Sequence, residues 1–200
     1  MRSVEASILK SVKAARRSSV FTGRDFLRYG NSAAVRKALE RLARRGDLRR
    51  VRRGFYDRPR PHPILGQTAP SAMAVIRSVM KDSGAKWQVS GAYAANLFHL
   101  SEQVPAKIVI LTDGIPRKIV LEKLTLDFRR AAPRHLLGGG RPAGAAIQAL
   151  RHIGRAGATS EVLGKLSRQL RPSAKAELAA LTPQLPVWLQ PIARQVSAPR

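Results

Sequence analysis

The sequence contains no cysteine. Disulfides, thiolate nucleophiles and cysteine-ligated zinc sites are therefore excluded, which agrees with a reducing, cytoplasmic location. Also absent are an apolar run of about 18 residues, the apolar core of a signal peptide, and a basic amphipathic terminus with aromatic anchors. From these absences we predict a soluble, cytoplasmic protein that does not bind a membrane.

Sequence motifs of catalytic and metal-binding sites are equally scarce. No HExxH or other paired-ligand spacing relates the four histidines, which are His62, His99, His135 and His152. A metal-dependent nuclease of the Glu-x-Lys type needs its carboxylate and lysine two positions apart, whereas Glu122 is followed directly by Lys123. The glycine run at residues 138–140 lacks the downstream Gly-Lys-Ser/Thr of a phosphate-binding loop and is interpreted as a plain loop. We predict no catalytic residue, no metal and no cofactor, and hence a protein that is not an enzyme.

Acidic residues are few, because 12 Asp and Glu stand against 37 Lys and Arg. The formal net charge at pH 7 is +25 on a chain of 200 residues. Positive charges at this density repel one another and destabilise the compact state, and binding to an acidic partner reduces this repulsion. Since the features of a membrane-binding protein are missing, the charge favours nucleic acid as the partner.

Three prolines at alternate positions, Pro59, Pro61 and Pro63, divide the chain. They remove backbone donors and favour an extended connector within residues 58–63. We therefore predict two domains, residues 1–60 and 61–200. The first domain contains 18 of the Lys and Arg residues and 5 of the Asp and Glu residues, so the smaller domain carries more than half of the net charge.

The most basic stretch is SAAVRKALERLARRG, residues 32–46. At about 100° of rotation per residue, one side of a helix collects the apolar residues Val35, Ala38, Leu39, Leu42 and Ala43. The charged residues collect on the other side, and Gly46 is suited to end the helix. The apolar side is expected to pack on a core while the cations face outward.

Two further helices are predicted before this basic helix. Thr22 and Asp25 have the spacing of a capping box, so a helix begins at Thr22 and runs to about Arg28. Turn residues then lead into the basic helix, which Asn31 or Ser32 caps. Apolar residues spaced by four, four and three positions in residues 4–15 predict the first amphipathic helix.

After Gly46, residues 48–51 and 55–57 are predicted to form two short strands joined by a basic turn. Three helices followed by a hairpin are typical of a winged helix-turn-helix, whose last helix enters a DNA major groove while the hairpin forms a wing. Base edges are the predicted targets of Arg36, Lys37 and Arg41, and phosphates are the predicted targets of Arg44, Arg45, Arg49, Arg52 and Arg53. Thr22 and Ser32 complete the predicted DNA-binding set.

The second domain is predicted to have a mixed α+β core to about residue 154 and a helical C-terminal part, so the fold class of the protein is α+β. Apolar patterns predict helices at residues 70–81 and 91–100, a strand buried on both faces at 106–111, and a hairpin of residues 119–121 and 124–128. Further helices are predicted at residues 143–153, 160–170, 173–181 and 187–196. Asp113 and Asp127 are interpreted as a turn residue and a strand-exterior residue.

Several stretches together resemble a known family. They are VFTGRDFL (residues 20–27), RVRRGFY (50–56), GAYAANL (91–97), QVPAKIV (103–109) and LTDG (111–114). Their combination resembles the AbiEi-type antitoxins of bacterial type IV toxin-antitoxin and phage-defence pairs. The resemblance runs from about residue 18 to residue 154, and its most specific part lies in the second domain, which is more compact than in the longer members.

The resemblance implies a winged-helix repressor that binds repeats of double-stranded DNA in the promoter of its own operon. It also implies a C-terminal domain that counters a nucleotidyltransferase toxin, which members of this family usually do without a stable complex; direct binding of the toxin stays open. Two other interpretations stay open. A stand-alone DNA-binding transcriptional regulator or an RNA-binding protein also explains the charge, although a single basic helix with a wing favours duplex DNA, and an enzyme such as a nuclease would need a site that the sequence does not display.

Overall fold

The structure, a computed structural model, describes residues 3–15, 19–59, 61–62, 66–67, 70–81, 83–102, 106–121 and 124–198. Residue contacts divide the chain into two compact units, Met1–Ser83 and Gly84–Arg200. Both units contain helices and strands, which confirms the predicted mixed α+β class.

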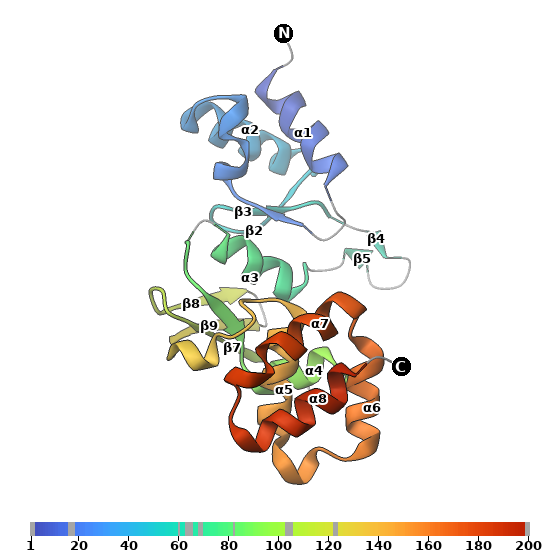
Figure 1. Ribbon diagram of the computed structural model, residues 1–200. Helices are drawn as coiled ribbons and strands as arrows, with labels where there is room; N and C mark the ends of the chain where they lie inside the picture. Colours follow the sequence, from blue (N-terminus) through green and yellow to red (C-terminus); the bar gives the residue numbers. More distant parts are fainter. Residues whose placement is uncertain are drawn as a thin grey trace. The chain divides into compact units, whose positions relative to one another are not determined.

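The first unit begins with helix α1 (Val4–Ala14), strand β1 (Val20–Phe21), the 3-10 helix η1 (Gly23–Tyr29) and helix α2 (Ser32–Arg44), shown in Figure 1. Strands β2 (Arg49–Arg52) and β3 (Phe55–Asp57) then form an antiparallel hairpin. The predicted helices and hairpin are confirmed, although the helix that begins after Thr22 has 3-10 rather than α geometry. Strand β1 was not predicted; it pairs with β3 and gives the sheet order β1-β3-β2.

The core of this unit lies between its helices and its sheet. Ile8 and Val12 of α1, Phe26 of η1, and Leu39 and Leu42 of α2 are each at most 3% exposed. The four residues of α1 and α2 among them are those that the helical spacing places on the apolar faces. Burial of one face of α2 therefore fixes which of its residues face outward.

Helix α3 (Ala72–Met80), predicted as part of the second domain, belongs to the first unit. It contacts β1, and the ammonium of Lys81 just after it forms an ion pair with Asp25 of η1. Between β3 and α3, strand β4 (Pro61–His62) pairs with β5 (Gly66–Gln67), whereas Arg60 and Pro63 of the predicted connector lie outside the described residues. The first unit thus extends beyond the residue-60 boundary, because α3 packs on it through tertiary contacts.

The second unit contains a sheet of the strands β6 (Trp87–Val89), β7 (Lys107–Thr112), β8 (Arg117–Leu121) and β9 (Leu124–Arg130) in the order β6-β7-β9-β8. The predicted β8–β9 hairpin is confirmed, and β7 runs parallel to β9. Strand β7 is not buried on both faces as predicted. Ile108 and Ile110 are buried while Val109 and Leu111 are half-buried, because helices cover one face of the sheet.

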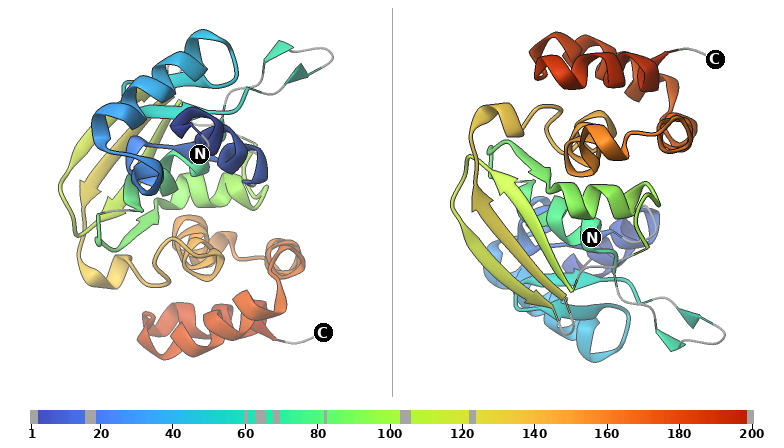
Figure 2. Two further views of the ribbon diagram at one scale, coloured as in Figure 1. Left: turned by 90° about the horizontal axis from the view of Figure 1, so that it is seen from above. Right: turned by 90° about the horizontal axis from the view of Figure 1, so that it is seen from below.

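Helices α4 (Gly91–Leu97) and α5 (Pro142–Gly157) form the layer on that covered face (Figure 2). Beyond α5 lie α6 (Ser160–Gln169), α7 (Pro172–Leu181) and α8 (Gln190–Ser197), which confirms the predicted helical C-terminal part. The first half of α5 is buried on all sides because it lies between the sheet and these helices.

Asp127 of β9 corrects a prediction, because it is not an exposed strand-exterior residue. Its side chain lies on the sheet face opposite to that of Leu126 and Phe128, yet Asp127 is only 4% exposed. The Nζ atom of Lys107 and the Nε atom of Arg129 lie 3.1 Å and 2.9 Å from its Oδ2 atom. Desolvation acts to raise the pKa of Asp127, but the hydrogen bonds and charges of these two cations outweigh it and lower the pKa below 3.8.

Candidate nucleic-acid interface

Helix α2 carries the most basic surface of the first unit. The side-chain oxygen of Asn31 accepts a hydrogen bond from the Ala34 amide at 2.9 Å and caps the helix, and Gly46 just beyond the helix has a φ of 80°. The charged face that the sequence predicts is exposed, with Arg36, Lys37, Arg41 and Arg44 all facing solvent. The helix thus places its cations on the side opposite to the core.

Carboxylates neutralise part of this face. Arg36 lies 3.8 Å from Glu40 one turn along the helix, and Arg41 lies 3.8 Å from Glu5 of α1. Arg45 is held more closely, because it pairs with Glu5 and also with Asp47 at 3.0 Å. Glu5 therefore ties the end of α2 to α1, a role that the sequence analysis did not foresee.

The side chains of five other cations of α2 and the hairpin have no ion pair or hydrogen bond with another residue in the described part of the chain. All are exposed, and we call them the unpaired cations: Lys37, Arg44, Arg50, Arg52 and Arg53. Lys37 and Arg44 are two turns apart on α2 and share one face. The other three lie on β2 and in the turn that Gly54, with a φ of 82°, allows.

Arg50 was missing from the predicted DNA-binding set. Residues alternate between the two faces of a strand, and β2 is half-buried at Arg49 and Val51 but exposed at Arg50 and Arg52. Arg50 is thus exposed like Arg52, although the strand register shifts between them, with Arg50 opposite Tyr56 and Arg52 opposite Phe55. A strict period of two in the sequence does not describe this strand.

Arg49 faces the other side of the hairpin and forms a structural ion pair. Its Nε atom donates a hydrogen bond to Oδ1 of Asp57 at 3.0 Å, and its Nη2 atom contacts Oδ2. The two residues are directly opposite each other in the β2–β3 register. Because the Asp57 side chain is only 5% exposed, it needs this cation for neutralisation.

Thr22 and Ser32 lie at the starts of η1 and α2. The backbone amide and the hydroxyl of Thr22 donate hydrogen bonds to Oδ2 of Asp25 at 2.8 Å and 3.2 Å, as the capping-box spacing predicts. Thr22 is half-buried, while Ser32 is exposed in the first turn of α2. Of the two residues, Ser32 is therefore the more exposed.

The comparison with known families gives one match. The profile of DUF6088, described as a family of unknown function, matches residues 7–193. The chain belongs to this family. No curated protein and no solved structure matches the sequence significantly. Family membership thus covers both units and leaves their roles to be argued from the residues.

A metal site and a membrane-spanning helix are two alternatives to a nucleic-acid interface. Within the described ranges, no group of three or more His, Asp and Glu residues lies close enough together to hold a metal ion. Among the helices of the same ranges, none is both long enough and apolar enough to cross a membrane. Neither a metal site nor a membrane-spanning helix thus accompanies the basic surface of the first unit within the described residues.

Proposed function

We propose that the first unit is a winged helix-turn-helix that binds duplex DNA, with α2 in the major groove and the β2–β3 hairpin as the wing. The succession of α1, η1, α2 and the hairpin supports this proposal, and β1 extends the sheet of the wing. The observation that carries it is that five exposed cations of α2 and the hairpin, the unpaired cations, have no carboxylate partner among the described residues.

We assign different roles to the cations of this surface according to whether carboxylates pair with them. We propose that Lys37, together with Arg36 and Arg41, reaches base edges, because exposed ion pairs at 3.8 Å contribute only about 0–1 kcal/mol and are readily exchanged for DNA contacts. Phosphates are the proposed targets of the other unpaired cations. Arg45 and Arg49 are placed outside the contact set, because carboxylates of the protein already hold them.

We further propose that the protein is the autorepressing antitoxin of a type IV toxin-antitoxin pair, as the resemblance to AbiEi-type antitoxins implies. In this proposal the first unit represses the operon, and the Gly84–Arg200 unit counters a nucleotidyltransferase toxin. The supporting observation is that GAYAANL and LTDG, the most specific stretches of the resemblance, lie on α4 and at the end of β7 within one unit.

The DNA-binding proposal is tested by fluorescence anisotropy on the full-length protein. The probes are a duplex from the promoter of its own operon, a random duplex of equal length and a structured RNA. If each of the four unpaired cations assigned to phosphates meets one phosphate, the slope of log affinity against log salt is about −3.6 or steeper. Lys37→Ala should reduce discrimination between the two duplexes by about 1–3 kcal/mol, whereas Arg52→Ala should weaken both alike and flatten the slope by about 0.9.

The matched control is Lys165→Ala, which removes an exposed cation from α6 in the second unit. Its affinity for both duplexes should equal that of the unchanged protein. Equal losses in Lys165→Ala and Lys37→Ala would show that only total charge matters and would overturn the assignment to α2. Tighter binding to the structured RNA than to either duplex would instead favour the RNA-binding interpretation.

The antitoxin proposal is tested by growth of cells that express the neighbouring gene, which we expect to encode a nucleotidyltransferase. Full-length protein should restore growth, and the Lys37→Ala/Arg52→Ala double variant should lose promoter repression while still restoring growth. Loss of both properties together would show that rescue depends on repression itself. Failure of the unchanged protein to restore growth would refute the antitoxin role and leave a DNA-binding regulator.

A further inference from the structure

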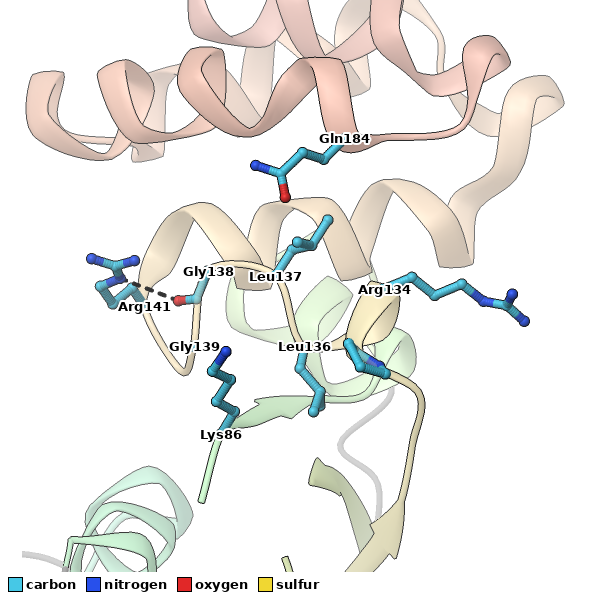
Figure 3. Close-up of a pocket in the computed structure, with 9 residues that line it drawn as sticks. Lys86, Arg134, Leu136, Leu137, Gly138, Gly139, Arg141 and Gln184 are labelled. Carbon is cyan, nitrogen blue, oxygen red and sulfur yellow. Dashed lines mark hydrogen bonds between the residues drawn. The ribbon is translucent and has the colours of Figure 1, made fainter. Parts of the chain in front are cut away.

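The second unit contains a pocket of about 520 Å³ that the proposed DNA-binding role does not use (Figure 3). Leu136 and Leu137 supply its apolar wall, with side chains that extend in opposite directions, while Gly138 and Gly139 form a backbone edge and Gln184 lies on the side of Leu137. This volume falls within the range of small-molecule sites and far exceeds what one inorganic ion fills.

The charged residues that line the pocket are all cationic. They are Lys86, Arg134 and Arg141, and no described carboxylate joins them in the lining. In Figure 3 the ammonium of Lys86 lies beside Gly138 and Gly139, while the side chain of Arg134 extends away from this loop. Lys86 and Arg141 are therefore the two cations placed to contact one ligand, with Arg134 adding charge at a greater distance.

The backbone of Lys86 is held firmly at the start of β6. Its amide donates to Oδ1 of Asp113 at 2.9 Å, and its carbonyl accepts from Oγ1 of Thr112 at 2.9 Å. Its ammonium has no ion pair with another described residue. A cation on a fixed backbone, with no carboxylate of its own, is available to an anionic ligand.

Arg141 is oriented from two sides. Its Nε atom donates to the carbonyl oxygen of Gly138 at 3.3 Å, and its Nη2 atom lies 2.8 Å from Oε1 of Glu177 in α7. These contacts hold the guanidinium beside the loop while 65% of the side chain stays exposed. The Nη1 group of Arg141 has no partner among the described residues and is available to donate to a ligand.

The glycine run gives this edge of the pocket its shape. Gly138, Gly139 and Gly140 all have positive φ values, which are 77°, 42° and 72°. A Cβ atom on Gly140 would come within 2.5 Å of the Trp87 indole, and one on Gly138 would come within 2.5 Å of Gly144. The glycine run thus allows the chain to pass close to β6 and α5, where a side chain would clash. These glycines therefore have a steric role, which differs from the role of glycines in a phosphate-binding loop.

We propose that this pocket binds an organic phosphate of nucleotide size. Lys86 and Arg141 project from different elements and suit the several oxygens and double charge of a phosphate monoester. The apolar wall of Leu136 and Leu137 accommodates the organic part, and Gln184 offers it a hydrogen bond. The pocket lies wholly within the Gly84–Arg200 unit, so this proposal stands independently of DNA binding by the first unit.

Isothermal titration calorimetry on the full-length protein tests the proposal with adenosine 5′-monophosphate, adenosine and inorganic phosphate as probes. The monophosphate should bind with a stoichiometry of one and at least tenfold more tightly than either of the other probes. Lys86→Gln should weaken its binding about tenfold or more, because a charge-assisted contact is lost. Lys165→Gln, the same change on an exposed cation of α6, should leave it unchanged.

Three outcomes would overturn the proposal. Equal weakening by Lys86→Gln and Lys165→Gln would show that the ligand responds only to the overall positive charge. Equal affinity for inorganic phosphate and the monophosphate would show that the apolar wall takes no part. Absence of monophosphate binding to the unchanged protein would refute the site outright. Thermal unfolding of Lys86→Gln followed by circular dichroism, measured alongside, should match that of the unchanged protein and shows that the second unit is folded.

Discussion

Replacement of Arg49 by alanine distinguishes a structural ion pair from the phosphate contact that the sequence predicts. The Asp57 side chain is 5% exposed and the Arg49 side chain is 25% exposed. Breaking a fully buried ion pair costs about 3–5 kcal/mol because the remaining charge stays uncompensated. Since water reaches a quarter of Arg49, we expect Arg49→Ala to lower the free energy of local unfolding of the hairpin by about 2–3 kcal/mol.

Amide hydrogen exchange measures this effect in the full-length protein, because it reports the opening of β2 and β3 separately from the second unit. Arg52→Ala on the same strand is the matched control, because Arg52 is exposed and unpaired. Its effect on exchange should correspond to less than about 0.5 kcal/mol. In the Arg49→Ala/Asp57→Ala double variant, the loss should be smaller than the sum of the two single losses.

Arg49 has no stabilising role in the hairpin if Arg49→Ala and Arg52→Ala leave its hydrogen exchange equally unchanged. If Arg49→Ala also flattened the salt dependence of DNA affinity by about 0.9 while the hairpin kept its stability, Arg49 would be a phosphate contact as the sequence analysis predicts. The two measurements together assign Arg49 to one role.

Three further predictions concern the cores and the pH response. Ile8→Ala, at a residue with no exposed surface, should lower the unfolding free energy of the first unit by about 2–5 kcal/mol in urea denaturation. Gly140→Ala should destabilise the second unit more than Gly139→Ala, by about 1–3 kcal/mol, because both have positive φ but only Gly140 has a side chain against its Cβ position; equal thermal shifts would contradict this. The lowered pKa of Asp127 stabilises the fold above its unfolded pKa of 3.8, and this contribution is lost as pH falls through the lower folded value. Acid titration followed by circular dichroism should therefore show a smaller loss of stability in Asp127→Asn, and parallel curves would refute this assignment.

The sequence by itself determined the local elements of this protein. Apolar spacing located α1 and α2, and the capping box at Thr22 located the start of η1, because these signals act within a few residues. The same spacing located the buried face of α2 and hence its cationic face. Charge and periodicity were therefore sufficient to propose a nucleic-acid interface.

Sequence periodicity did not reveal which elements pair or pack across the chain. The pairing of β1 with β3, the parallel alignment of β7 with β9, and the inclusion of α3 in the first unit all join segments that are distant in sequence. No local propensity encodes such contacts, because their free energy comes from the burial of surfaces that meet only in the folded chain.

The same distinction applies to individual charges. Arg49 and Arg52 are indistinguishable in the sequence, yet the register of β2 and β3 places one against Asp57 and leaves the other unpaired. Lys86 and Arg141 are 55 positions apart in the sequence and share a pocket only because β6 and the glycine run before α5 come together. Sequence thus determined the total charge and its helical faces, whereas tertiary structure decided which charges are neutralised, because ion pairing depends on distances that only the fold sets.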